Sequence, residues 1–167
     1  HRSGAGDFPE ETLAAFRGCA ENPDFQVDYF EFDLHMTADN VLVLSHDATL
    51  DRVSDAATVF GAERVLVRDK TLAELKELNM AAQFVSDAGE MPYAALHGAA
   101  VPDELRILSL DEVLDYLTSA GDYHYIIEIK DGGETGLAAA DQLYATLKAR
   151  NLLDRVIIGS FRDEVAD

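Results

Sequence analysis

The sequence is poor in positive charge, has a single cysteine and lacks any long apolar run. Its 167 residues include 13 Lys and Arg against 32 Asp and Glu, which gives a formal net charge of −19 with neutral histidines. Because phosphate backbones and anionic lipids repel an acidic protein, neither nucleic acid nor a membrane surface is expected as a partner. Cys19 stands alone and therefore excludes an internal disulfide. No stretch approaches the roughly 20 apolar residues of a membrane-spanning helix, so no transmembrane segment is predicted.

Length and composition indicate one globular domain that is large enough to bury a core. Hydrophobic residues make up 48% and charged residues 27% of the chain, which is typical of soluble globular proteins. The first residue is His1 rather than methionine and no signal peptide is recognisable, so a leader could have been removed. We expect a soluble protein, cytoplasmic rather than exported, with export as the alternative. The sequence makes no prediction of oligomeric state.

Segments with strand patterns alternate with segments that have helical spacing. The strand-like segments are 29–34, 41–46, 125–130 and 155–161. The helical segments are 9–20, 71–80, 109–119 and 135–150. Residues 51–109 are less regular, and within them residues 83–104 are predicted to be rich in loops. Strands separated by helices predict an α/β fold with a mostly parallel sheet.

Charged side chains within these strands distinguish two versions of such a fold. Glu31 and Asp33 lie two residues apart and therefore share one strand face, and the same holds for Glu128 and Lys130. The strands of a doubly wound sheet are almost entirely apolar, whereas a barrel of parallel strands builds its active site from polar groups near the carboxyl ends of its strands. The pattern therefore favours a barrel.

Three acidic side chains on these strands need a compensating charge. If Glu31, Asp33 and Glu128 converge in the sheet interior, their burial costs several kcal/mol unless a cation or a proton neutralises them. Three oxygen donors suit Mg²⁺ or Ca²⁺, and Lys130 would offset part of the charge. Alternatively, the acids lie at a solvated strand edge and pair with Lys and Arg. Spacing alone leaves both interpretations open.

Two histidines and one arginine are candidates for the chemistry. Imidazole titrates near neutrality, so His1 and His46 could transfer protons, and Asp47 could orient the ring of His46. Arg2 has the fork geometry that suits a phosphate, although each of these residues could equally be an ordinary surface group. The other three histidines lie beside no comparable cluster and are expected to be structural; they are His35, His97 and His124.

The motifs become specific when they are taken as a series. Residues 31–52 read EFDLHMTADNVLVLSHDATLDR, which combines E-x-D, T-x-D, H-D and L-x-R at fixed offsets. The block is preceded by His1-Arg2 and Pro9-Glu10 and followed by SLDEVL and IEIK. This series resembles the glycerophosphodiester phosphodiesterase family, and the resemblance extends from residue 1 to about residue 161.

The resemblance implies a fold and a cofactor. The fold is a TIM (β/α)8 barrel in which segment 51–108 is inserted after the strand that carries His46. The cofactor is a divalent metal ion, Mg²⁺ or Ca²⁺, held by Glu31, Asp33 and Glu128.

The resemblance also implies a reaction. His1 and His46 would act as general acid and base, and Arg2 and Lys130 would contact the phosphate of a small-molecule phosphodiester substrate. The reaction would be metal-dependent hydrolysis of a glycerophosphodiester to an alcohol and glycerol 3-phosphate. Two alternatives are a related phosphodiesterase that acts on lysophospholipid headgroups and a catalytically inactive barrel fragment that acts as a binding module.

The sequence departs from the family pattern at three points. Ser3 stands where the family usually has glycine, and Glu11 stands where it usually has asparagine. The third departure is length, because a barrel of this type takes about 250 residues. With four strand segments of eight, residues 1–167 are expected to form a partial barrel, truncated at both ends.

Overall fold

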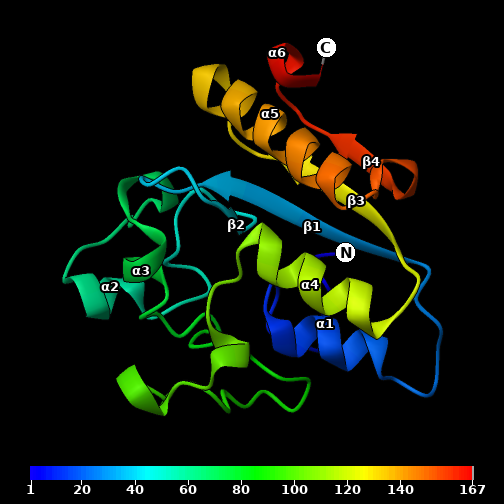
Figure 1. The fold of residues 1–167 in the computed structure, drawn as a ribbon. Coiled ribbons are helices and arrows are strands. Elements are labelled where there is room, and N and C mark those ends of the chain that lie inside the picture. Colours follow the sequence, from blue (N-terminus) through cyan, green and yellow to red (C-terminus); the bar gives the residue numbers. More distant parts are fainter. Residues whose placement is uncertain (167) are drawn as a thin grey trace.

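The computed structural model describes residues 1–166 and contains one four-stranded sheet with the order β2-β1-β3-β4 (Figure 1). The strands are β1 (Tyr29–Met36), β2 (Leu42–Leu44), β3 (His124–Ile129) and β4 (Val156–Gly159). β1 pairs with β3 and β3 pairs with β4, both in parallel. All four strands expected from the sequence are present, and the sheet is an open arc of the kind that a partial barrel forms.

The direction of β2 differs from the expectation of a parallel series. β2 pairs with β1 in antiparallel fashion, with Leu34 opposite Leu44. The connection is a tight turn in which the Asn40 amide donates to the Thr37 carbonyl at 3.0 Å, and Asn40 has a φ of 60°. A parallel crossover needs a dozen or more residues, and residues 37–41 are too few. The described residues therefore contribute three parallel strands, with a hairpin at one edge.

Within the described part of the chain, residues 1–166, six α-helices and four 3₁₀ segments accompany the sheet. The α-helices are α1 (Leu13–Ala20), α2 (Ala56–Phe60), α3 (Leu72–Leu75), α4 (Leu110–Ala120), α5 (Gly133–Ala149) and α6 (Asp163–Ala166). The 3₁₀ segments are η1 (Val67–Asp69), η2 (Gly98–Ala100), η3 (Asp103–Leu105) and η4 (Leu153–Arg155). None of the helices within residues 1–166 is long and apolar enough to cross a membrane.

The main core lies between one face of the sheet and helices α1, α4 and α5 (Figure 1). Phe30, Phe32 and Leu34 of β1 are all buried in it, and the ring of Phe16 from α1 lies 5.4 Å from Phe30 and 5.8 Å from Phe32. The period-two alternation of the strand thus sends its apolar residues toward the helices. Glu31 and Asp33 are left on the opposite face.

Helix starts follow local capping chemistry. The capping boxes expected at Thr71–Glu74 and Ser109–Glu112 are both present. The first helix begins later than its 9–20 pattern predicts, because the hydroxyl of Thr12 accepts the Ala15 amide and caps α1 at residue 12. Segment 71–80 is helical only over Leu72–Leu75. The helix does not continue to residue 80, because Asn79 makes tertiary hydrogen bonds instead. Its backbone amide donates to the Asp55 carboxylate, and its side-chain amide donates to two backbone carbonyls.

Segment 51–108 packs mainly in apolar clusters separate from the main core, which only Leu108 of this segment joins. In one of these clusters Leu75 and Ile107 pack with Val43 of β2 and with Leu50, and all four have no solvent exposure. A smaller cluster gathers around Leu105. The segment lies beside the hairpin end of the sheet (Figure 1), so it is positioned to border whatever site the carboxyl ends of the strands form.

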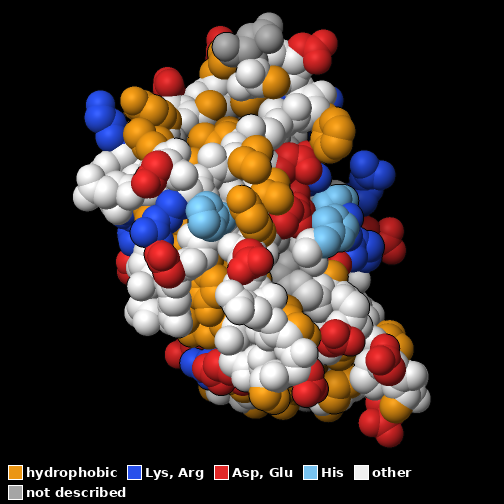
Figure 2. Space-filling model, turned by 90° about the vertical axis from the view of Figure 1, so that its right-hand side faces the viewer, with side chains coloured by type: hydrophobic (Ala, Val, Ile, Leu, Met, Phe, Trp, Pro, Cys, Tyr) orange, Lys and Arg blue, Asp and Glu red, His pale blue; other side chains and the backbone are white. Residues whose placement is uncertain are grey.

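The far edge of the sheet is exposed. β4 is the edge strand, and Ile157 and Ile158 are 57% and 44% exposed. Phe161, which follows β4, is 87% exposed. Acidic side chains are distributed over the whole face shown in Figure 2, with hydrophobic side chains between them. The exposed apolar strand contrasts with the closed edges of a complete barrel.

Candidate active site

Neighbouring strands bring the three predicted acids together. Asp33 of β1 lies in register with Glu128 of β3, and Glu31 lies two residues before Asp33 on the same face. One carboxylate oxygen from each of the three residues lies within 4.8 Å of the others. The solvated-edge alternative is excluded for Asp33, which is only 1% exposed.

The buried carboxylate of Asp33 has few partners that could stabilise its negative charge. Neither of its carboxylate oxygens has a hydrogen-bond partner within residues 1–166, and its Oδ1 forms an ion pair with the ammonium of Lys130 at 3.3 Å. Burial raises the pKa of Asp33, with Lys130 opposing the shift and Glu31 adding to it. Buried acceptors are normally satisfied, so this carboxylate marks a place where a further ligand is expected.

Lys130 lies between the acids, with its Nζ 3.0 Å from Glu128 and 3.3 Å from Asp33. Burial lowers the pKa of this ammonium, but the two carboxylates outweigh that effect and raise it. Three carboxylates and one ammonium carry a net charge of −3 + 1 = −2. That charge and the all-oxygen donor set fit one hard divalent cation.

The first residues of the chain close one side of the cluster. The Arg2 amide donates to Glu31 Oε2 at 2.6 Å, and the Ser3 amide donates to the Glu31 carbonyl at 3.2 Å. Ser3 has a φ of 59°, in the left-handed region that favours glycine, so this loop adopts a conformation that a glycine would take more easily. The Arg2 side chain is 3.6 Å from Glu10. His1 is exposed, one residue before this contact.

His46 is held by a chain of charged side chains. Its Nδ1 lies 2.6 Å from Asp47, which also accepts a hydrogen bond from Arg52 Nε. Burial raises the pKa of Asp47, but the hydrogen bonds from Arg52 and His46 outweigh this and lower it. Because Nδ1 is occupied by Asp47, Nε2 is the nitrogen left for chemistry. His46 borders the same cleft as Glu128 and Lys130, a space of about 430 Å³.

His35 also borders this cleft, a position that sequence reasoning missed. It is 5% exposed, and its Nδ1 lies 2.7 Å from Asp131, whose other oxygen accepts the Met36 amide. Burial raises the pKa of Asp131, but the bonds from His35 and Met36 outweigh it and lower it. The spacing in the sequence could have indicated this position, because His35 lies two residues beyond Asp33 and therefore on the same strand face.

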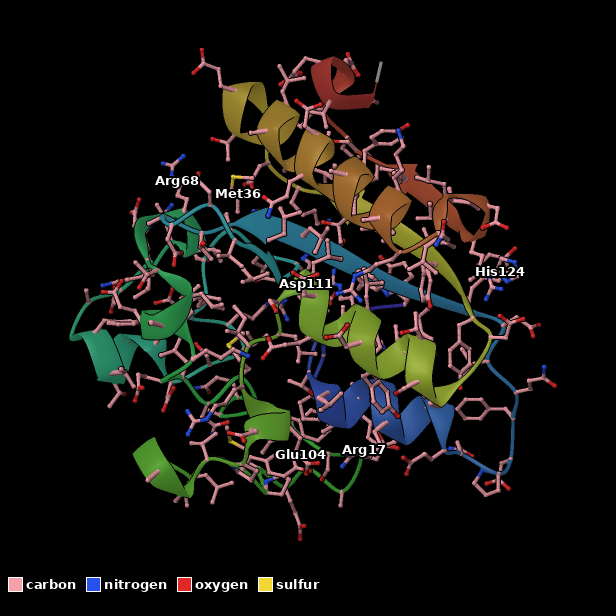
Figure 3. All side chains as sticks on the ribbon, viewed as in Figure 1. Arg17, Met36, Arg68, Glu104, Asp111 and His124 are labelled. Carbon is pink, nitrogen blue, oxygen red and sulfur yellow. The ribbon has the colours of Figure 1, made fainter. Side chains whose placement is uncertain are left out.

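The other two histidines lie elsewhere. His97 is near Asp55, at 3.4 Å, in segment 51–108. His124 begins β3 and its ring lies 5.0 Å from that of Tyr29; Figure 3 shows it at the opposite end of the sheet from Met36. Neither residue borders the cleft of the acid cluster.

Glu11 is a fourth acid beside the cluster. It is 3% exposed, its Oε1 accepts the Asp33 amide at 3.2 Å, and its Oε2 has no partner within residues 1–166. Burial, reinforced by the charge of Asp33, raises the pKa of Glu11 well above its usual range. Where the family pattern that the sequence resembles would place an asparagine, Glu11 brings a negative charge and a side chain that is longer by one methylene.

The fold and the site together define a partial barrel of parallel strands with a candidate divalent-metal site at its centre. The sequence model of the Glycerophosphoryl diester phosphodiesterase family matches residues 1–164. The chain therefore belongs to this family.

Individual relatives agree with this assignment. The chain is 31% identical over 169 residues to a glycerophosphodiester phosphodiesterase of Bacillus subtilis, covering 98% of this chain and 52% of the relative. It is 33% identical over 161 residues to one of Caldanaerobacter subterraneus, covering 96% and 56%. An Oleispira antarctica phosphodiesterase, solved with the product sn-glycerol-3-phosphate, superimposes with a TM-score of 0.71 at 22% identity over 99% of this chain and 57% of that one. The chain thus spans about half the length of these relatives.

Proposed function

We propose that the chain carries the catalytic centre of a metal-dependent phosphodiesterase that hydrolyses glycerophosphodiesters to an alcohol and glycerol 3-phosphate. The observation that carries the proposal is the convergence of Glu31, Asp33 and Glu128 with a buried, poorly compensated Asp33. Family membership supports the substrate class. The product named for the Oleispira phosphodiesterase agrees with the proposed reaction.

The three acids would hold the metal ion, Mg²⁺ or Ca²⁺. When bound, such an ion supplies positive charge that stabilises the developing charge on a phosphoryl oxygen. Lys130, whose ammonium lies beside Asp33 and Glu128, would contact the phosphate. Arg2, whose Nε is buried without a partner among the described residues, would also contact the phosphate.

The two histidines would transfer the protons. His46 presents Nε2, because Asp47 holds its Nδ1, and it is suited to exchange a proton with the nucleophile or the leaving alkoxide. His1 would take the complementary role, since the Arg2 amide bound to Glu31 keeps the first residue close to the cluster. One histidine acts as base while the other acts as acid.

A second candidate substrate is a lysophospholipid. A pocket of about 210 Å³ lies beside Arg52 and Glu10, next to the His46 network. Its walls include apolar side chains of segment 51–108, which are Val53, Met80, Phe84 and Val85. Such walls would hold the acyl chain that a lysophospholipid carries on its glycerol. The observation supports a lysophospholipid whose headgroup alcohol leaves while the acylated glycerol keeps the phosphate.

Hydrolysis assays test both candidates. Glycerophosphocholine and lysophosphatidylcholine are offered to the chain with Mg²⁺ or Ca²⁺, and phosphate-containing products are quantified. Glu31→Gln should remove the metal dependence, and His46→Ala should abolish turnover, whereas Glu134→Gln, at an exposed position of α5, should behave like the wild type. Near-normal hydrolysis by both site variants would refute the roles. Absence of hydrolysis by a folded, metal-loaded wild type would favour the binding-module alternative.

A further inference from the structure

We propose that His35 is a specificity residue that accepts a hydrogen bond from a hydroxyl of the glycerol group of the substrate. The inference deepens the proposed function and rests on it. It starts from the unexplained nitrogen of this side chain. His35 Nε2 has no hydrogen-bond partner within residues 1–166 although the residue is only 5% exposed.

The position of His35 makes it part of the same site. It follows Glu31 and Asp33 at intervals of two residues on β1, so the three side chains occupy one strand face. Its ring borders the cleft that also contains His46, Glu128 and Lys130. A molecule whose phosphate lies at the acid cluster would therefore have its adjoining group within reach of His35.

Asp131 determines what Nε2 can do. A carboxylate only accepts, so the 2.7 Å contact requires the hydrogen to be on Nδ1. In the neutral ring Nε2 is then an acceptor with a free lone pair. The Asp131 carboxylate is itself fixed, because it also accepts the Met36 amide at 2.8 Å. The ring is thus fixed in orientation and in tautomer before any ligand binds.

An acceptor at this place selects hydroxyl donors. Phosphate oxygens carry no hydrogen to donate when ionised, and Lys130, Arg2 and the acid cluster with its cation already serve them. A glycerol group has hydroxyls directly beside its phosphate ester, and a buried acceptor left without a donor penalises a ligand that lacks them. His35 would therefore discriminate glycerol esters from simple alkyl esters of phosphate.

The test compares the binding of glycerol 3-phosphate and propyl phosphate, which differ only in the two hydroxyls. Dissociation constants are measured by titration calorimetry in Mg²⁺ or Ca²⁺ for the wild type, His35→Leu and His35→Phe. The wild type should bind glycerol 3-phosphate about 10-fold more tightly, the factor expected for one hydrogen bond. Both variants should reduce this ratio toward one, by weakening glycerol 3-phosphate binding, and should not weaken the binding of propyl phosphate.

A matched control variant separates contact from structure. His97→Leu also removes a histidine that lies beside an aspartate, but outside the cleft, and it should keep the wild-type ratio. Equal weakening of both ligands by the His35 variants would assign His35 to the phosphate or to the fold and overturn the proposal. So would an unchanged ratio, or a wild type that does not discriminate.

Nitrogen NMR of the unmodified protein provides a measurement that needs no variant. His35 should show a protonated Nδ1 and a bare Nε2, and the Nε2 resonance should move with glycerol 3-phosphate and stay in place with propyl phosphate. The opposite tautomer, or equal responses to both ligands, would contradict the proposal. If the wild type discriminates the ligands but does not hydrolyse glycerophosphocholine, the proposed function fails and the His35 contact stands. If the wild type hydrolyses glycerophosphocholine but binds both ligands equally, the proposed function stands and the His35 contact fails.

Discussion

The guanidinium of Arg52 donates two hydrogen bonds to the carboxylate of Glu10, at 2.9 and 2.6 Å, and so joins two loops that lie 42 residues apart in the sequence. The same guanidinium contacts Asp47, which holds Nδ1 of His46. Arg52 is therefore a positioning residue for His46, and the planar fork of arginine makes both contacts at once. This arrangement explains the L-x-R motif that follows H-D in the sequence.

Replacing Arg52 should reduce turnover without removing substrate binding. We expect Arg52→Gln, and also Arg52→Lys because an ammonium cannot fork, to lower kcat by about 10- to 100-fold, since small displacements of a catalytic group are costly. KM should change little. Steady-state kinetics on glycerophosphocholine provide the measurement. Arg155→Gln, which breaks the exposed ion pair with Asp122 before β3, is the control. A kcat of Arg52→Gln equal to that of the control would rule out a positioning role.

The same network should make stability depend on acid pH. Burial raises the pKa of Glu10, but Arg52 outweighs it and lowers the pKa, as it does for Asp47. The folded state then binds fewer protons than the unfolded state, whose carboxyls titrate near pH 4. The stabilisation is complete above that pH and is lost as the pH falls through the lowered values. Urea unfolding between pH 3 and 7 should show a flatter profile for Arg52→Gln than for the wild type; parallel profiles would contradict this.

Sequence reasoning predicted the site better where it relied on strand geometry. The period-two rule placed Glu31 and Asp33 on one face, and parallel pairing brought Glu128 beside them. It missed the antiparallel direction of β2, although the short Ala38–Asn40 turn carried that information. It also did not foresee the contact of His35 with Asp131, because the two residues lie 96 positions apart. Contacts between distant loops have no periodic signature.

Glu11 offers a direct test of the electrostatics at the acid cluster. Glu11→Gln keeps an acceptor for the Asp33 amide and removes a buried charge that has an unpaired oxygen. We expect the metal-free protein to gain about 1 kcal/mol in free energy of unfolding at pH 7, because a neutral amide costs less to bury than a carboxylate and does not repel Asp33. Divalent ions should bind a few-fold more weakly, because the site loses negative charge. Glu134→Gln on α5 is the control, and a loss of stability in Glu11→Gln would refute this account.

Adding a divalent ion should stabilise the folded chain. A ligand that binds only the folded state at 100 times its dissociation constant adds about 2.7 kcal/mol. We therefore expect the Tm to rise with Mg²⁺ or Ca²⁺ and to fall back with EDTA, at constant ionic strength set by NaCl. Asp33→Asn and Glu128→Gln should abolish the rise. A rise that persists in both variants would locate the bound ion outside the acid cluster.

Monovalent salt should also stabilise the protein, by a different route. A net charge of −19, distributed over the surface in Figure 2, repels itself in the compact state. Salt screens this repulsion, since the Debye length falls from about 30 Å at 0.01 M to about 3 Å at 1 M. It also weakens exposed ion pairs such as Arg17–Glu104, but each of these contributes at most about 1 kcal/mol.

The expected result is a Tm that rises with NaCl or KCl in EDTA, with most of the rise below about 0.5 M, where the screening length changes most. Replacing exposed acids by lysine tests the cause. Asp87→Lys combined with Glu63→Lys changes the net charge by +4, two units for each substitution, at positions that are exposed to solvent. Because less repulsion is left to screen, the double variant should be more stable at low salt and gain less from added salt. A salt response that is equally large in the wild type and the double variant would show that preferential hydration, rather than charge repulsion, controls the stability of this chain.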